Sequence, residues 1–251
     1  LGCEPVILET GPATRWMPTA EMIEDLSVRL DGVLVASPNN PTGTMLQPER
    51  LAAIARVCRD RGMWLISDEI YHGLTYERPA ETALSFSDDC IVVNSFSKYY
   101  SMTGWRVGWM VVPERLVRPL ERLAQNLYIS PPAVSQVAAI GAFDGVAELE
   151  ANRRVYAEIR ALLLSELPRA GFDRIVPADG AFYLYADVSA LTDDSLAFAR
   201  RMLEETGVAA TPGVDFDAKR GKRFLRFSYA GRTEDMAEAA QRLARWREKA
   251  G

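Results

Sequence analysis

Short apolar runs that each end in polar or turn-forming residues constrain the fold of this chain more than any other feature of the sequence. Runs of this length between turn residues are typical of buried strands. Between the first two runs, apolar residues recur at helical spacing from Pro48 to Gly62. The first turn of a helix tolerates proline, and glycine can end a helix. Strands that alternate with helices predict an α/β fold. The runs are GVLVAS (residues 32–37), MWLISDEIY (63–71), CIVVNSFSK (90–98) and VGWMVVP (107–113).

Polar side chains follow the ends of three of these runs. Asn40, Asp68 and Lys98 come at or after the carboxyl end of the first, second and third run. In open α/β sheets, ligands bind outside the carboxyl ends of the strands. We therefore expect these three residues to lie at one edge of one sheet and to form a binding site.

The second half of the chain has a different pattern. Residues 114–168 read as mostly helical, with breaks at ISPPAV (129–134) and near Gly145, and they end in a long amphipathic stretch able to bridge two domains. Short strands flanked by helices follow in AFYLYADVS (181–189), GVAATPG (207–213) and RFLRFSYA (223–230). We predict a large domain over residues 1–148 and a smaller α+β domain over residues 149–251.

Composition limits the partners that we expect. The net charge is −5, Lys and Arg are scattered among the acids, and no apolar run approaches the length that spans a bilayer. We therefore predict neither a nucleic-acid nor a membrane partner. The three cysteines form no CxxC pair, which favours a reducing compartment and a cytoplasmic location. The only histidine, His72, has no metal-spaced partners, so we expect no metal site and interpret it as a loop residue.

The strand-end residues have a chemistry in common. A lysine amine such as that of Lys98 can form a Schiff base with a carbonyl. A carboxylate at the end of an apolar strand, Asp68, is costly to bury unless it pairs with a positive group, and a pyridinium nitrogen is such a partner. The Tyr71 phenol and the Asn40 amide could both hydrogen-bond a phenolic oxygen. Taken singly, Asp68 could equally cap its turn and Asn40 could equally serve turn geometry.

A phosphate site is also predicted beside Lys98. Ser95 and Ser97 offer two hydroxyl donors, and the Arg106 guanidinium can bind two oxygens at once. Plain strand-end hydroxyls remain an alternative interpretation of the two serines. Together with the amine, carboxylate, phenol and amide, these groups indicate pyridoxal phosphate.

Four motifs in order carry a family resemblance. SPNNPTG, SDEIY, SFSKYYSMTGWRVGW and FLRFSYA resemble, in sequence and separation, the class I/II aminotransferases of the fold-type I pyridoxal-phosphate family. The resemblance covers nearly the whole chain. It implies a large domain with a three-layer, mostly parallel sheet, a homodimer, and a role in amino acid metabolism. It also implies that the family's N-terminal portion is lacking from these residues.

The resemblance implies a role for each site residue. Lys98 would be the Schiff-base lysine and proton shuttle, and Asp68 would pair with the pyridine nitrogen. The ring hydroxyl would be bound by Tyr71 and Asn40, and the phosphate by Ser95, Ser97 and Arg106. Arg226 would grip the substrate α-carboxylate, with Asn40 also near the substrate. The implied reaction moves an amino group from an α-amino acid to a 2-oxo acid by a ping-pong mechanism.

Other function classes stay open at this point. The same scaffold can carry out β-elimination on a sulfur-containing amino acid, which would make the protein a β-lyase. A catalytically incompetent aminotransferase chain is a second alternative. A ligand-sensing, non-catalytic domain is a third, although regulators of that kind carry a winged-helix segment, and the sequence shows no such segment and no basic helix.

Overall fold

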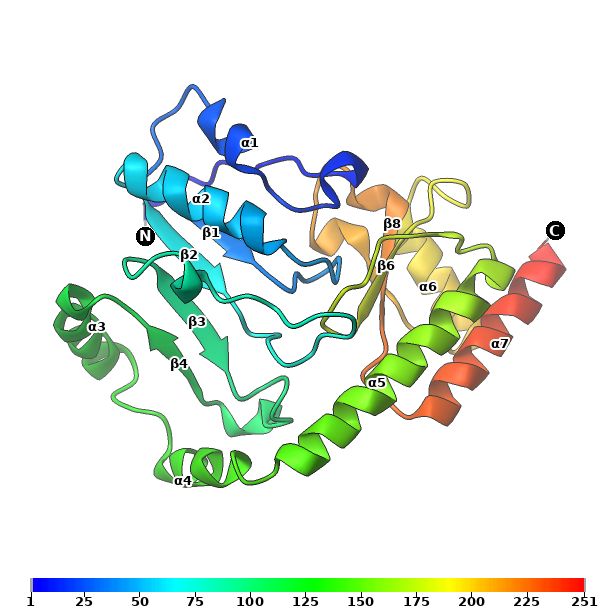
Figure 1. Ribbon diagram of the computed structural model, residues 1–251. Helices are drawn as coiled ribbons and strands as arrows, with labels where there is room; N and C mark the ends of the chain where they lie inside the picture. Colours follow the sequence, from blue (N-terminus) through cyan, green and yellow to red (C-terminus); the bar gives the residue numbers. More distant parts are fainter. Residues whose placement is uncertain (1, 251) are drawn as a thin grey trace. The chain divides into compact units, whose positions relative to one another are not determined.

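The structure is a computed structural model that describes residues 2–250, with side chains described up to residue 249 (Figure 1). The described residues form two compact units. Unit 1 contains the chain up to Pro38 together with Met45–Leu149, and unit 2 contains Asn39–Thr44 together with the chain from Glu150 onward. The loop Asn39–Thr44 therefore clusters with unit 2 although its neighbours in sequence belong to unit 1. The predicted division into domains after residue 148 stays a prediction.

Unit 1 is built on a mostly parallel sheet. The strands follow the order β1-β2-β3-β4, with β1, β2 and β3 parallel and β4 antiparallel to β3. Each strand falls within one of the apolar runs identified in the sequence. The α/β fold with a mostly parallel sheet is therefore confirmed. The strands are β1 (Gly32–Ala36), β2 (Trp64–Asp68), β3 (Ile91–Ser95) and β4 (Gly108–Val111).

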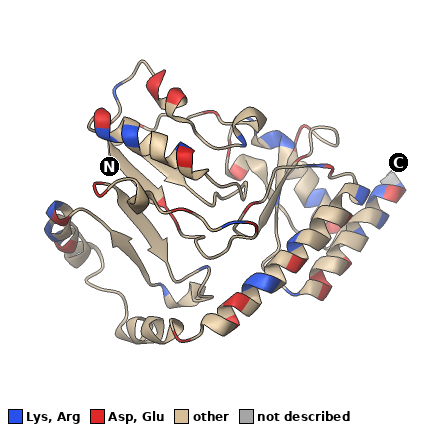
Figure 2. Cartoon of the chain, viewed as in Figure 1, with Lys and Arg blue, Asp and Glu red and all other residues tan. Residues whose placement is uncertain are grey.

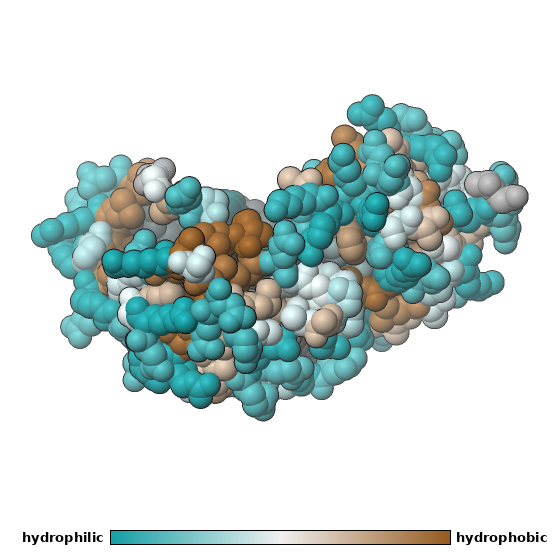
Figure 3. Space-filling view, turned by 90° about the horizontal axis from the view of Figure 1, so that it is seen from above, coloured by the Kyte–Doolittle hydropathy of each residue, from teal (hydrophilic) through white to brown (hydrophobic). Residues whose placement is uncertain are grey.

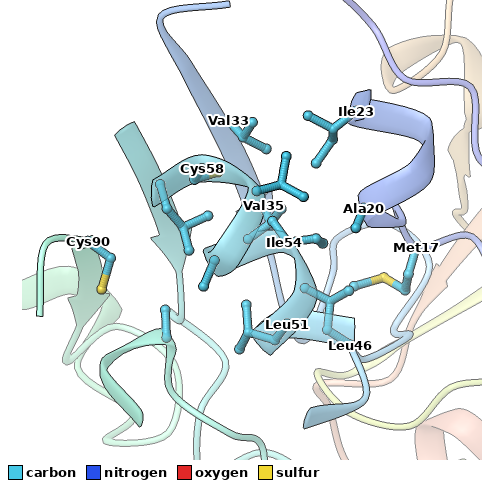
Figure 4. Close-up of a cluster of buried hydrophobic side chains, with 14 of the residues drawn as sticks. Met17, Ala20, Ile23, Val33, Val35, Leu46, Leu51, Ile54, Cys58 and Cys90 are labelled. Carbon is cyan, nitrogen blue, oxygen red and sulfur yellow. The ribbon is translucent and has the colours of Figure 1, made fainter. Parts of the chain in front are cut away.

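Helices α1 (Ala20–Glu24) and α2 (Pro48–Asp60) cover one face of this sheet. Pro48 occupies the first turn of α2, as expected, because its missing N–H would have no helical partner there. Alternate strand residues pack against the helices, so that Val33 and Val35 are buried while Leu34 between them is 69% exposed. The packed face is shown in Figure 4 and includes Val33, Val35, Leu65, Val92, Ile23, Leu51, Ile54 and Cys58.

Unit 1 continues into a helical region. The helices are α3 (Glu114–Leu127), α4 (Ala133–Ala142) and α5 (Val146–Glu166), which passes from unit 1 into unit 2. The predicted breaks near residues 129–134 and Gly145 are confirmed. Several aliphatic side chains of α4 are exposed, among them Val134, Val137 and Ile140, and exposed apolar side chains are visible as brown patches in Figure 3. Among the described residues, no helix is long and apolar enough to cross a membrane.

Unit 2 is built on an antiparallel sheet in the order β5-β6-β8-β7. Two helices accompany it, α6 (Ser195–Thr206) and α7 (Thr233–Ala250). Asp194 caps α6 by accepting hydrogen bonds from the N–H groups of Leu196 and Ala197, and Gly207 ends the helix with a left-handed backbone. The strands are β5 (Arg174–Ile175), β6 (Tyr183–Asp187), β7 (Thr211–Pro212) and β8 (Phe224–Ser228).

Short helical turns and a mixed surface complete the description. Basic and acidic residues are interspersed along α5 and α7 rather than segregated by sign (Figure 2). Such mixing offers no continuous basic stripe on these helices. The 3-10 helices lie at Pro12–Thr14, Ala83–Ser85, Thr103–Trp105, Leu167–Ala170, Gly213–Asp215 and Gly221–Arg223.

Candidate active site

The carboxyl end of β2 carries the first group of predicted site residues. Asp68 is the last residue of β2 and pairs in register with Ala36 of β1. One Asp68 carboxylate oxygen, Oδ1, accepts a hydrogen bond of 3.1 Å from the Ile70 N–H. Asp68 therefore does cap its turn, and this capping uses one of the two carboxylate oxygens. The turn that follows carries Tyr71.

Lys98 and Tyr71 lie close together in unit 1. Tyr71 is 4% exposed, and the Lys98 Nζ lies 5.8 Å from the centroid of its ring. That separation is within the range of a cation–π contact. Lys98 follows β3, the strand that runs parallel to β2 beside it, so both residues lie beyond the carboxyl ends of neighbouring strands.

Gly73 closes the turn that carries Tyr71. Its φ is +87°, and a Cβ at this position would lie 2.5 Å from Cδ2 of Tyr99. Both the left-handed backbone and the closeness of the ring therefore require glycine here. Because Tyr99 is the residue next to Lys98, the turn after β2 packs directly against the segment that carries the lysine.

The residues predicted to bind a phosphate are linked by a local hydrogen-bond network. Ser95 Oγ lies 2.9 Å from Ser97 Oγ and accepts a hydrogen bond from the Ser97 N–H. Thr103 Oγ1 donates to the Ser97 carbonyl at 2.6 Å, and the Thr103 carbonyl accepts from Arg106 Nη1 at 2.9 Å. Arg106 is exposed and has a left-handed backbone with φ of 54°. For a non-glycine residue such a backbone is a strained state that is common at functional sites.

Arg226 and Asn40 form a second group, within unit 2. Arg226 lies in the middle of β8 and pairs with Tyr185 of β6 on one side and with Thr211 of β7 on the other. Its Nη1 donates to Asn40 Oδ1 at 2.7 Å, and its Nη2 donates to Thr211 Oγ1 at 3.2 Å. Asn40 itself is exposed. The guanidinium thus occupies a fixed position and points two donors at acceptors that an oxyanion could replace.

Two aromatic rings confine this guanidinium. Its carbon lies 4.3 Å from the centroid of Tyr183 and 4.7 Å from that of Phe216. Among the described residues, the buried Nε of Arg226 has no hydrogen-bond partner. A buried donor without an acceptor costs free energy, so an additional acceptor is expected to bind here.

Tyr185, which faces Arg226 across the β6–β8 ladder, differs from Tyr71 in its setting. Its ring stacks on Phe224, with centroids 4.8 Å apart. Burial raises the pKa of the Tyr185 phenol well above its usual value; Asp217 adds to the rise, and Arg220 partly opposes it. Tyr185 therefore stays neutral at physiological pH and serves as packing rather than as a proton acceptor.

The predicted residues fall into two sets. The structure brings Lys98 to Tyr71, and it brings Ser95, Ser97 and Arg106 into one network. Tyr71 and Asn40, predicted to share one ligand, belong to different units. Within residues 2–250, no group of three or more His, Cys, Asp or Glu side chains is placed to hold a metal ion.

The sequence analysis missed several residues that support the site. Thr103 lies inside a recognised motif, and only its hydroxyl-bearing side chain hinted at a role. Thr211, Tyr183 and Phe216 gave no signal, because strand register and loop folding bring them to Arg226.

Comparison with known proteins places this arrangement in a family. The family described as aminotransferase class I and II matches residues 2–243. The valine–pyruvate aminotransferase of Mycobacterium tuberculosis is 52% identical over 98% of this chain and 64% of its own length. The (5-formylfuran-3-yl)methyl phosphate transaminase of Methanocaldococcus jannaschii is 34% identical over 97% of this chain and 63% of its own length.

Solved structures agree with this similarity. An aminotransferase from Mycobacterium tuberculosis superposes with a TM-score of 0.96 at 51% identity, over 99% of this chain and 65% of that one. The aspartate aminotransferase of Thermus thermophilus, solved with maleate, gives a TM-score of 0.89 at 33% identity, over 96% of this chain and 63% of that one. The chain thus spans somewhat less than two thirds of the length of these relatives. It belongs to the class I and II aminotransferases.

Proposed function

We propose that this protein is a pyridoxal-phosphate-dependent aminotransferase that moves an amino group from an α-amino acid to a 2-oxo acid in a ping-pong reaction. The observation that carries the proposal is the contact between Lys98 and Tyr71 at the sheet edge where Asp68 ends β2. Membership in the aminotransferase family supports the same activity.

The donor set of unit 1 fits this cofactor. An aldehyde requires an amine, a ring nitrogen that is to stay protonated requires a carboxylate, a ring oxygen requires a phenol, and a phosphate requires hydroxyl and guanidinium donors. Each of these groups is present on adjacent strand ends of one sheet. The residues of unit 1 that would hold the cofactor are Lys98, Asp68, Tyr71, Ser95, Ser97 and Arg106, and the family resemblance implies that Asn40 binds the same ligand.

The protein's own residues then divide the work. When bound, the cofactor supplies an electron sink for the bond broken at the substrate α-carbon. Lys98 would hold the cofactor through its amine and would move a proton at the substrate α-carbon. Asp68 would pair its negative charge with the N–H of the ring nitrogen. The Tyr71 hydroxyl would donate a hydrogen bond to the ring oxygen of the cofactor.

Arg226 provides the specificity for an α-carboxylate. A carboxylate can accept two parallel hydrogen bonds from a guanidinium, which fixes both its position and its orientation. The Arg226 side chain is buried at its Nε and lies against two aromatic rings, so its movement is already restricted. Little side-chain entropy is therefore lost when the carboxylate binds. Valine and pyruvate are the first substrate pair to test, because the relative that is 52% identical is named for them.

We also propose a cytoplasmic homodimer. The exposed aliphatic side chains of α4, which include Val137 and Ile140, offer an apolar surface of the kind that subunit contacts bury. Sedimentation of the purified chain measures the state directly. A monomer at all concentrations would contradict the dimer and leave the proposed chemistry standing.

The cofactor is tested by absorption and covalent labelling. Purified protein mixed with pyridoxal phosphate should acquire a new absorption band, and borohydride should fix the cofactor to Lys98, which peptide mass spectrometry locates. Lys98→Ala should lose both the band and the label, whereas the exposed control Lys222→Ala should retain both. Labelling that persists in Lys98→Ala would contradict the assignment of the lysine.

Product analysis separates transamination from elimination. With an amino acid and a 2-oxo acid, a transaminase yields the exchanged pair, and with the amino acid alone it leaves pyridoxamine phosphate on the protein. Release of pyruvate and ammonia from a sulfur-containing amino acid would instead favour a β-lyase. Cofactor labelling without turnover of any amino acid would favour a non-catalytic role.

A further inference from the structure

Glu69, the residue after Asp68, is a buried carboxylate with an unusual set of partners. The residue is 3% exposed. One oxygen, Oε1, accepts hydrogen bonds from Ser67 Oγ at 3.1 Å, Thr82 Oγ1 at 3.1 Å and the Ala83 N–H at 2.8 Å. Three donors on one oxygen compensate for the burial of this polar group. The other oxygen, Oε2, lies 3.4 Å from Nδ1 of His72.

His72 connects this carboxylate to the end of β1. The Nε2 atom of its ring lies 3.1 Å from the Ser37 carbonyl oxygen, and 19% of its side chain is exposed. Ser37 is held from the other side as well, because its N–H donates to the Asp68 carbonyl at 3.1 Å. The imidazole therefore spans the gap between two acceptors, the Ser37 carbonyl and the Glu69 carboxylate. The residue follows Tyr71 directly, so these two contacts also restrain the turn that carries Tyr71.

We propose that Glu69 and His72 are positioning residues that hold Tyr71 and Asp68 against the end of β1, and that the protonation of His72 adjusts the position of Tyr71. The inference rests on the proposed function for its bearing on the cofactor. The contacts that join Glu69, His72 and Ser37, called the bracket below, lie wholly within unit 1. They can be studied in the protein without a ligand.

The number of protons on the ring decides how many of its contacts are hydrogen bonds. A neutral imidazole carries one N–H and can donate to only one of the two acceptors, whichever tautomer it adopts. The imidazolium donates to both. Burial lowers the pKa of His72, while Glu69, the Ser37 carbonyl, Glu81 and Asp68 act in the opposite direction. The second of the two hydrogen bonds therefore forms only when the ring is protonated, which its lowered pKa shifts below the ordinary histidine range.

A cysteine thiol also lies near the bracket. Cys90 lies close enough to Glu69 for that charge to raise the pKa of its thiol, after the larger effect of burial. This thiol is protonated throughout the acidic range, so it does not titrate together with His72. The thiol is thereby separated from the imidazole, and the NMR signals of the His72 ring itself assign a transition below neutral pH.

The single histidine of the chain makes the first test direct. The imidazole NMR signals belong to His72 alone, and the Tyr71 ring signals can be assigned by their loss in Tyr71→Phe. In the ligand-free protein, we expect His72 to titrate below 6.5, and we expect the Tyr71 signals to shift with the same midpoint. A His72 midpoint at its usual value, with Tyr71 signals that ignore it, would overturn the inference.

Charge removal tests the role of Glu69. Glu69→Gln keeps the shape and the acceptor for Ser67, Thr82 and Ala83 but removes the negative charge, so the His72 pKa should fall further. Glu81→Gln is the matched control, because it removes a charge that acts on His72 less strongly than Glu69 does. We expect a smaller fall in this control. Equal shifts in the two variants would contradict the pairing with Glu69.

Substitution of the ring tests the consequence for the cofactor. In His72→Gln the side-chain amide can still donate to the Ser37 carbonyl, whereas His72→Ala cannot. We expect His72→Ala to weaken pyridoxal-phosphate binding about tenfold, because one net hydrogen bond is lost, and His72→Gln to restore most of it. The component of the bound cofactor's spectral pH dependence that follows the His72 midpoint should vanish in both variants. Circular dichroism shows whether each variant is folded.

The outcomes distinguish the two proposals. If the wild-type protein binds no cofactor, the proposed function fails, and the coupling of Tyr71 to His72 in the ligand-free protein still decides the inference. If the wild type is labelled at Lys98 and His72→Ala binds the cofactor equally well with an unchanged pH profile, the inference fails and the proposed function stands.

Discussion

The two sheets of the molecule position their candidate residues in different ways. In unit 1, Lys98 and Tyr71 follow the ends of parallel strands, and turns and side-chain bonds to the backbone set their places. In unit 2, Arg226 lies within an antiparallel ladder, with paired strands on both sides. The burial differs too, since β6 is buried from Tyr183 to Ala186 whereas β1 alternates between buried and exposed residues. We therefore expect the site geometry of unit 2 to depend more on the integrity of its sheet than that of unit 1 does.

The largest expected effect is on the free energy of unfolding, when a buried leucine of unit 2 is compared with an exposed leucine of unit 1. Leu184 of β6 is fully buried, so Leu184→Ala should lower the free energy of unfolding by about 2–5 kcal/mol through lost burial and the cavity it leaves. Leu34 of β1 is 69% exposed, and Leu34→Ala should change that free energy by no more than about 0.5 kcal/mol. Urea unfolding measures both. A large cost for Leu34→Ala would mean that this face of the sheet is covered in solution.

Arg226→Lys comes next in size. A lysine cannot reproduce the two parallel donors or the stacking between Tyr183 and Phe216. We expect the KM for the amino acid substrate to rise about 10–100-fold, as the loss of a charge-assisted bidentate contact implies. Steady-state kinetics test this, with the exposed Arg223→Lys as the control. A similar KM increase in both variants would mean that Arg226 does not bind the substrate carboxylate.

Helix caps give a smaller contrast between the units. Asp194 accepts two N–H bonds at the start of α6 in unit 2, at 3.1 and 3.0 Å, whereas Thr19 accepts one bond of 3.3 Å at the start of α1 in unit 1. Asp194→Ala should therefore destabilise the protein by about 1 kcal/mol, and Thr19→Ala by less. Thermal unfolding of the two variants compares them. The reverse order would show that α1 contributes more to stability than its length suggests.

The smallest expected effect concerns the cysteines, all of which lie in unit 1. Cys3 is exposed, whereas burial raises the pKa of Cys58 to about 11 and also raises that of Cys90. Because the thiolate is the reactive form, a thiol reagent at pH of about 8 should modify Cys3 quickly and the other two slowly. Urea should make all three react. Fast modification of Cys58 in the native protein would show that the packed face of unit 1 opens readily.

Much of the fold could be predicted from the sequence because its signals are local. Periodicity identified the strands and α2, and the carboxyl-end rule placed Asp68 and Lys98 at one edge. The partners of those residues could not be predicted in the same way. Arg226 donates to Asn40 across 186 positions, and Thr82 reaches Glu69 through a loop of irregular structure. Such contacts depend on strand register and loop paths, which composition and spacing do not encode.

The contacts of His72 could not be predicted from the sequence either. Its position in a turn was predicted correctly, and its lack of metal-spaced partners gave no reason to assign it a role. The contacts with Glu69 and Ser37 depend on where β1 and β2 end relative to each other. A lone histidine therefore carried too little local information for its contacts to be predicted.

The packing of Gly73 on Tyr99 also limits how the protein can be redesigned. No side chain fits at position 73 while an aromatic ring occupies position 99, so the two positions form one steric unit. Libraries that aim to alter the reaction by varying the neighbours of Lys98 should therefore randomise both positions together. A smaller residue at 99 would make room for alanine at 73 only if the chain also tolerates the positive φ there. Varying position 73 alone would yield strained variants.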